Sequence, residues 1–282
     1  MQHIKNIPLT SANNKIFGVD ICLQPCTNKK PMVVYAHGFN GFKDWGNMDI
    51  VAEQFAAAGF VFVKFNFSHN GTSLSQPTEF VDLEAFGNNN YTKQLNDLST
   101  VVNWLHTNDN PALLQINLQQ FYLIGHSMGG GLAILYAATD KRIKKLITWA
   151  SISECKTPWG SWSTQQMADW KTTGVAYYNN QRTQQQMPLY YQLYEDYEQH
   201  QQLLNIKNAI TSLQIPILIC HGSNDTSVNI SNAYTLQQCQ PTAALCIVES
   251  DHVFGRKHPW LGTEMPAPMK VIVQASIQFL LR

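Results

Sequence analysis

The stretch QFYLIGHSMGGGLAILYAA, residues 120–138, decides the fold. Its first residues are mostly apolar and predict a buried strand over 120–125, and the small and apolar residues that follow predict a helix over 129–139. Between the two lies a G-x-S-x-G pattern centred on Ser127. Glycines beside a serine allow a tight strand-to-helix turn that lifts the hydroxyl off the end of a sheet, with the next backbone N–H aimed at the same point. The pattern therefore predicts Ser127 as a nucleophile and the N–H of Met128 as an oxyanion donor.

Strand-like and helix-like segments alternate on both sides of this turn. Short apolar runs predict further strands over 31–38, 59–67, 145–151, 215–222 and 244–250. Helical periodicity predicts further helices over 48–58, 91–107, 229–239 and 267–281. The first 30 residues alternate weakly, which indicates an edge hairpin or meander. Strands that alternate with helices form a mostly parallel sheet covered by helices, so the sequence predicts an α/β fold.

One stretch, residues 152–208, interrupts this alternation and is called the insertion below. It carries no strand signal but is rich in glutamine and in aromatic residues, namely Trp159, Trp162, Trp170, Tyr177, Tyr178, Tyr190, Tyr191, Tyr194 and Tyr197. We expect it to lie on a core made of residues 1–151 and 209–282, without a core of its own. Tyr190, Tyr194 and Tyr197 fall at helical spacing. Two interpretations stay open: the aromatic residues dock the insertion on the core, or they form the wall of an apolar pocket.

Composition narrows the possible functions. The 282 residues include 19 basic and 19 acidic side chains, so the formal net charge is zero. This balance argues against a broad charged surface for nucleic acid or an anionic membrane. No apolar run approaches the roughly 18 residues that cross a bilayer, and the first ten residues lack the apolar segment of a signal peptide. The six cysteines form neither a C-x-x-C pair nor a zinc-like cluster. We therefore expect reduced thiols, a cytoplasmic location, and no metal or organic cofactor.

A serine hydroxyl is a weak nucleophile at neutral pH and needs a base and an orienting acid. After this kind of turn the acid comes next along the chain and the histidine comes last. His252 directly follows the predicted strand 244–250 and is the expected base. The other downstream histidines are His200, His221 and His258.

The expected acid is Asp225, three residues past the glycine that ends the strand 215–222. The carboxyl ends of parallel strands share one edge of the sheet, where such folds place their sites. Asp251 and Glu249 are the alternatives. A residue adjacent to His252 in the chain rarely reaches its ring, so Asp225 is preferred.

A second oxyanion donor is expected in His37-Gly38-Phe39, at the end of the strand 31–38. The N–H of Phe39 is that donor, and Gly38 and Gly41 let the loop turn close to the site. We expect His37 to hold this loop and His126 to pack at the end of its strand. His69 follows the second strand and either lines the site or is an ordinary loop residue.

These segments together resemble the α/β-hydrolase superfamily. The matching motifs are HGF (37–39), GHSMGG (125–130), HGSNDTSV (221–228) and DHVF (251–254). The likeness covers nearly the whole chain from about residue 30 and is closest to feruloyl/cinnamoyl-type carboxylesterases and serine aminopeptidase-like hydrolases. It implies the same five site residues, a helical lid at the position of the insertion, and no cofactor. The sequence departs from many relatives in NFSHNGTS (66–73), where Asn66 replaces an acid.

The resemblance implies a serine hydrolase that cleaves a small-molecule carboxylic ester through an acyl-enzyme. If the aromatic residues of the insertion form a pocket wall, that ester carries a bulky or aromatic group. A peptidase or amidase and an acyltransferase are alternatives on the same fold. An enzyme specific for a free amine needs an acid in the insertion, and the available acids are Glu154, Asp169, Glu195, Asp196 and Glu198. A non-catalytic binding module is a further alternative, and it predicts that the five site residues do not converge.

Overall fold

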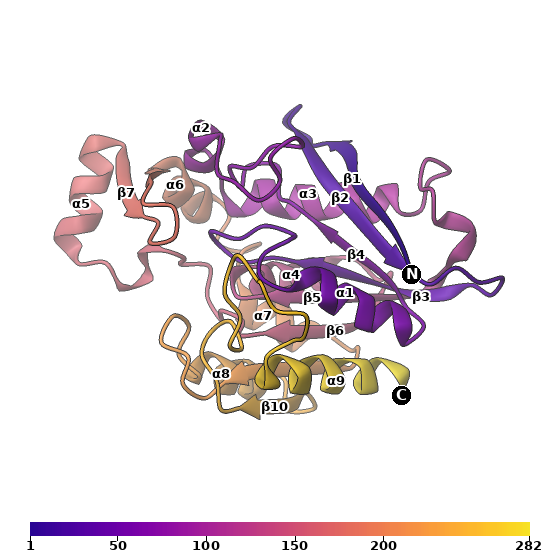
Figure 1. Ribbon diagram of the computed structural model, residues 1–282. Coiled ribbons are helices and arrows are strands. Elements are labelled where there is room, and N and C mark those ends of the chain that lie inside the picture. The colour runs from indigo at the N-terminus through magenta and orange to yellow at the C-terminus, as the bar shows by residue number, and fades with distance from the viewer.

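The computed structural model describes residues 1–282 and contains one central sheet of eight strands (Figure 1). The strand order is β1-β2-β4-β3-β5-β6-β9-β10. In chain order the bounds are β1 Gln2–Thr10, β2 Ile16–Leu23, β3 Lys30–Ala36, β4 Val61–Phe65, β5 Ile116–His126, β6 Ile143–Trp149, β9 Ile217–Gly222 and β10 Ala244–Val248. The strands from β4 to β10 in this order pair in parallel, whereas β1 and β2 form an antiparallel hairpin at one edge. The predicted edge hairpin and parallel sheet are confirmed.

Helices cover both faces of the sheet because side chains alternate between the faces along each strand. Val33 and Tyr35 of β3 pack with α1 (Met48–Ala57) and α9 (Ala267–Leu281) on one face. Met32 and Val34 pack on the opposite face, which is covered by α3 (Tyr91–Trp104), α4 (Met128–Thr139), α7 (Ile206–Ser212) and α8 (Ser231–Cys239). No helix combines the length and the apolar character that crossing a membrane requires.

The insertion differs from its prediction. It contains two helices, α5 (Thr164–Thr173) and α6 (Gln192–Gln199), but also an antiparallel pair of strands, β7 (Val175–Asn179) and β8 (Gln186–Tyr190). The prediction of no strand in 152–208 is therefore wrong, and the insertion is not purely helical. Tyr190 ends β8 rather than sharing a helix with Tyr194 and Tyr197. The strands are short, and Tyr177 is exposed, so little apolar alternation marks them in the sequence.

The insertion lies beyond the carboxyl end of the sheet, at the end opposite both chain termini (Figure 1). Polar contacts join it to α3 and to the short α2 (Leu83–Gly87), which the sequence did not predict. Thr92 Oγ1 donates to Asp196 Oδ1, and Asn90 Nδ2 donates to Gln192 Oε1 over 2.7 Å. The last three residues of the insertion form the start of α7. This helix packs on α4 and is one of the helices that cover the central sheet.

Candidate active site

The turn between β5 and α4 presents Ser127 at the carboxyl edge of the sheet. Ser127 has φ 57° and ψ −122°, a left-handed conformation that only a tightly held turn stabilises in a non-glycine residue. Its N–H donates to the carbonyl of Trp149 at the end of β6 over 2.8 Å. Gly129 lets α4 pass close to β3, because a Cβ there would lie 2.3 Å from the carbonyl oxygen of His37. The Ser127 hydroxyl forms no hydrogen bond within the protein and faces a cavity.

Two backbone N–H groups flank this hydroxyl without acceptors of their own. Met128 is the first residue of α4, so its N–H has no acceptor within the helix. The N–H of Phe39 donates to no other group of the protein. The two loops lie in contact, since a Cβ on Gly38 would be 2.8 Å from the Cβ of Ser127. An oxyanion formed at Ser127 would therefore find free donors nearby.

Asp225 and His252 are hydrogen-bonded to each other at the same edge. Asp225 follows β9, His252 follows β10, and Nδ1 of His252 donates to Oδ2 of Asp225 over 2.7 Å. The buried His221 lies on the other side, with Nε2 3.3 Å from the same oxygen and 2.8 Å from the carbonyl of Val228. Burial alone would raise the pKa of Asp225, but the hydrogen bonds from His221 and His252 lower it below its ordinary value. The carboxylate is thus ionised and oriented toward His252.

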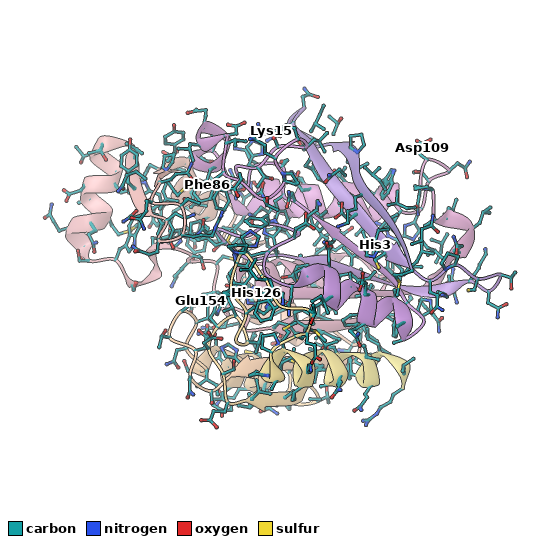
Figure 2. The ribbon with its side chains drawn as sticks, viewed as in Figure 1. His3, Lys15, Phe86, Asp109, His126 and Glu154 are labelled. Atoms are coloured by element: carbon teal, nitrogen blue, oxygen red, sulfur yellow. The ribbon has the colours of Figure 1, made fainter.

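Two further histidines hold the loops of the site in place. Nε2 of His126 donates to the backbone carbonyl of His252 over 3.0 Å, and the two rings lie 4.9 Å apart. Figure 2 shows His126 at the end of the sheet that faces the insertion. Nδ1 of His37 donates to the carbonyl of Gly38 over 2.9 Å, and its Nε2 accepts from the N–H of Phe67. Burial lowers the pKa of both histidines, that of His37 to about 4, so both rings are neutral.

A cavity of about 450 Å³ joins these groups. Its wall includes Ser127, His252 and Phe39. No carboxylate lines it, and its single permanently charged residue is Arg256. The wall therefore carries a net positive charge, which disfavours an ammonium group and tolerates an anion.

A second cavity of about 600 Å³ lies within the insertion, between α5 and the β7–β8 hairpin. Trp162, Trp170 and Tyr177 form much of its apolar wall, and Asp169 is its one charged residue. Pro158 and Tyr178 line both this cavity and the one at Ser127, so the two cavities are neighbours. The aromatic residues of the insertion serve both purposes. Trp159, against which Tyr194 and Tyr197 pack, lies edge-on to Tyr91 of α3 and docks the insertion on the core, whereas other rings form the cavity wall.

Of the five predicted site residues, Ser127, His252 and Phe39 line one cavity, Met128 follows Ser127 at the start of α4, and Asp225 is bonded to His252 behind it. The other candidate histidines lie elsewhere: His258 accepts from the N–H of Gly46, and His200 bonds within the insertion. His69 bonds the neighbouring Ser68 and does not line the cavity, so the loop-residue interpretation holds.

Sequence reasoning missed Arg256, Tyr35 and Trp45, which also line the cavity at Ser127. No motif marks them. Tyr35 lies in a predicted strand and Arg256 in an irregular loop after His252, so only the folded chain brings them to the site.

Three carboxylates outside the site, Asp20, Asp44 and Asp49, lie close enough to share a cation. The ammonium groups of Lys43 and Lys64 already occupy this cluster: Lys43 Nζ lies 2.7 Å from Asp20 and 2.6 Å from Asp44, and Lys64 bonds Asp44 and Asp49. The cluster is a buried ion network between β2, β4 and α1, with its charges already paired.

Comparisons with known proteins agree with this architecture. The family described as the alpha/beta hydrolase fold matches residues 31–209. A quorum-quenching protein, AidA, from Acinetobacter baumannii is 28% identical over 42% of this chain and 34% of its own length. A monoacylglycerol lipase from Mycolicibacterium smegmatis is 32% identical over 40% of this chain and 35% of its own length. The matched stretch thus spans about a third of these relatives. Est1E from Butyrivibrio proteoclasticus, solved with ferulic acid bound, superposes with a TM-score of 0.65 at 18% identity, covering 98% of both chains.

The site lies where this fold places it, at the carboxyl edge of a parallel sheet. The chain belongs to the alpha/beta hydrolase fold family.

Proposed function

We propose that this protein is a serine hydrolase that cleaves carboxylic esters through an acyl-enzyme intermediate. The observation that carries the proposal is the 2.7 Å bond between Asp225 and His252 beside a cavity that Ser127 and His252 both line. With Nδ1 committed to Asp225, Nε2 of His252 is the ring nitrogen left to accept a proton. The similarity to a monoacylglycerol lipase, itself a protein named for cleaving esters, supports the same chemistry.

In the proposed reaction His252 takes the proton of the Ser127 hydroxyl as its oxygen attacks the ester carbonyl. The N–H groups of Phe39 and Met128 bind the oxyanion, and Asp225 stabilises the charged imidazole. The alcohol leaves with the proton from His252. A water molecule, deprotonated by His252, then attacks the acyl-enzyme and releases the acid.

The lining of the cavities favours an ester over the alternatives. An aminopeptidase requires a carboxylate near the scissile bond for the ammonium group, and none lines the cavity at Ser127. Of the five candidate acids of the insertion, only Asp169 lines the neighbouring cavity. The apolar wall of that cavity fits a bulky or aromatic group, and we propose that the ester carries such a group in its acyl or alcohol part. We also place the protein in a reducing compartment, the cytoplasm, because all six cysteines are free.

The proposal is tested by labelling with a fluorophosphonate probe and by replacing Ser127 with alanine. The wild-type protein is expected to be labelled and to hydrolyse 4-nitrophenyl esters. Ser127→Ala removes the nucleophile, so kcat is expected to fall by about 10⁵-fold or more and labelling to disappear. Ser75→Ala, an exposed serine outside the site, is the matched control and keeps both. Turnover by Ser127→Ala near the wild-type rate would overturn the assignment.

A further inference from the structure

The most unusual residue of the cavity at Ser127 is Arg256, a buried cation without a carboxylate partner. The whole residue is 4% exposed. None of the ion pairs of the protein includes Arg256, whereas the two buried lysines, Lys43 and Lys64, both pair with carboxylates. Burial lowers the pKa of Arg256, and the one acid that opposes this is Asp251, which instead accepts hydrogen bonds from the N–H groups of Val253 and Gly255. Burying an unpaired charge is costly, so its persistence needs a reason.

The protein satisfies only part of the guanidinium group. Nε donates to the carbonyl of Val253 over 2.9 Å, and one terminal nitrogen, Nη1, lies 3.1 Å from the sulfur of Met48, a weak acceptor. The ring of Trp45 lies 5.5 Å from its central carbon and contributes a cation–π contact. The one further partner of the guanidinium is the hydroxyl of Tyr35, a neutral acceptor. The positive charge of Arg256 therefore has no carboxylate partner at the cavity that both residues line.

A neutral hydroxyl group lies beside this charge. Burial raises the pKa of Tyr35, and a hydrogen bond that its oxygen accepts from Arg256 partly offsets the rise, so its own O–H is left to donate. Tyr35 and Arg256 line the same cavity as Ser127 and His252. The histidines nearby, His37 and His126, are held neutral by burial. One uncompensated positive charge with an adjacent O–H matches a group with one negative charge and several acceptor lone pairs.

We propose that Arg256 and Tyr35 form an anion-binding subsite for a free carboxylate carried by the ester substrate. The substrate class is then a monoester of a dicarboxylic acid, whose acyl part carries the free carboxylate. This inference rests on the proposed esterase function and adds a specificity that the apolar insertion does not provide. The competing explanation is that Arg256 only holds the loop after His252, through its bond to Val253.

The test compares each anionic ester with a neutral ester of nearly the same shape. The probes are the mono-4-nitrophenyl esters of succinate, glutarate and adipate, each paired with the corresponding methyl 4-nitrophenyl diester. The wild-type protein is expected to prefer at least one monoester over its methylated partner by about tenfold or more in kcat/KM, the gain typical of a charge-assisted bond. Equal rates for every pair would overturn the proposal.

Variants separate recognition from positioning. Arg256→Met is expected to remove the preference for the monoester, and Tyr35→Phe to reduce it. Arg256→Lys, which retains the charge, is expected to restore part of it. If Arg256 only positions the loop, Arg256→Met lowers both rates and leaves their ratio unchanged, which would also overturn the proposal. Lys257→Met, which removes an adjacent exposed cation, is the control for a general charge effect.

A binding measurement keeps the result independent of esterase activity. Calorimetry with monomethyl glutarate and with dimethyl glutarate reports on the subsite in wild-type and Arg256→Met protein. If no ester is hydrolysed but the monoanion alone binds, and only to the wild type, the subsite stands and the proposed function fails. If esters are hydrolysed without preference and neither compound binds selectively, the function stands and the subsite fails.

Discussion

The turn at Ser127 and the insertion meet at one pair of cavities, yet they are held in different ways. At the turn the backbone itself determines the geometry: Gly129 allows the close approach of α4 and β3, and Met128 to Ala137 of α4 are all buried. In the insertion, side chains determine the geometry. Aromatic rings pack edge-to-face against one another, and Trp170 Nε1 donates to the carbonyl of Leu189 over 2.6 Å.

This difference suits the two regions to different roles, the turn to the chemical step and the insertion to the choice of substrate. Backbone contacts admit almost no alternative side chain, so the turn keeps a fixed arrangement for a chemical step. Side-chain contacts can be exchanged with much smaller penalties, so the insertion can change the shape of its cavity while the sheet stays the same. We therefore expect substitutions at the turn to affect folding and rate, and substitutions in the insertion to affect the choice of substrate.

Two glycines test this contrast most strongly. Gly129→Ala would put a Cβ within 2.4 Å of two backbone oxygens, those of Ala36 and His37. Neither can move without disturbing β3, so we expect a loss of at least about 4 kcal/mol of unfolding free energy, or no folded protein. Gly174, in the insertion, has φ 74° but nothing within 4 Å of a Cβ. Gly174→Ala is expected to cost about 1 kcal/mol, the penalty of a left-handed alanine.

Urea unfolding of both variants, followed by circular dichroism, measures the two losses. Similar, small losses would show that the turn is no more constrained than the insertion, and the contrast between backbone and side-chain control would be wrong.

The same contrast explains what could be predicted from the sequence. Local backbone rules fix the region around Ser127, so the strand, the turn, the helix and the edge position of Asp225 and His252 follow from residue types and spacing. Nothing comparable marks β7 and β8, whose pairing depends on contacts such as Trp170 with Leu189 that are distant in the chain. Prediction fails there because tertiary packing, not local pattern, selects the strands.

Arg256 and Tyr35 escaped prediction for a related reason. A buried arginine at a cavity has no spacing rule, because the burial itself exists only after β3, the loop of Trp45 and the loop after His252 have come together. The role of His221 was not predicted either, because its contact with Asp225 requires the curve of the chain between 222 and 228.

A second prediction concerns pH and again separates the two regions. Burial lowers the pKa of His37 to about 4, against about 6.5 in an unfolded chain. The unfolded chain therefore binds a proton that the folded protein excludes. The stability linked to neutral His37 is fully present above pH 6.5 and is lost as the pH falls toward 4, by about 3 kcal/mol in all.

Urea unfolding of wild-type and His37→Gln protein between pH 7 and pH 4 gives the free energy of unfolding at each pH. The contribution of His37 is the difference between the two proteins in the slope of this free energy against pH. Asp97, whose pKa burial raises to about 7, acts in the opposite direction, but it is present in both proteins and cancels in the difference. His200→Gln, at a partly exposed histidine of the insertion, is the control and should follow the wild-type curve. Parallel curves for wild type and His37→Gln would contradict a buried neutral histidine at the oxyanion loop.

The smallest effect is expected for the cavity of the insertion. Trp162 is half-buried, forms part of the cavity wall and packs edge-to-face against Trp170 with ring centres 5.0 Å apart. Trp162→Ala removes apolar surface that a long or aromatic substrate group would cover, which is worth about 1.5 kcal/mol or slightly more. We expect kcat/KM for 4-nitrophenyl octanoate and cinnamate to fall about tenfold, while the value for the acetate changes by less than about twofold, because an acetyl group does not reach this cavity.

The control is Trp104→Ala, which removes an equally half-buried tryptophan from α3, outside both cavities. A general loss of stability would lower the rates for all three esters in both variants. An effect confined to the larger esters, and to Trp162→Ala, would assign substrate choice to the insertion. If Trp162→Ala lowers the acetate rate as strongly as the octanoate rate, the insertion supports the chemical step itself. The turn at Ser127 and the insertion then do not divide reaction and substrate choice between them.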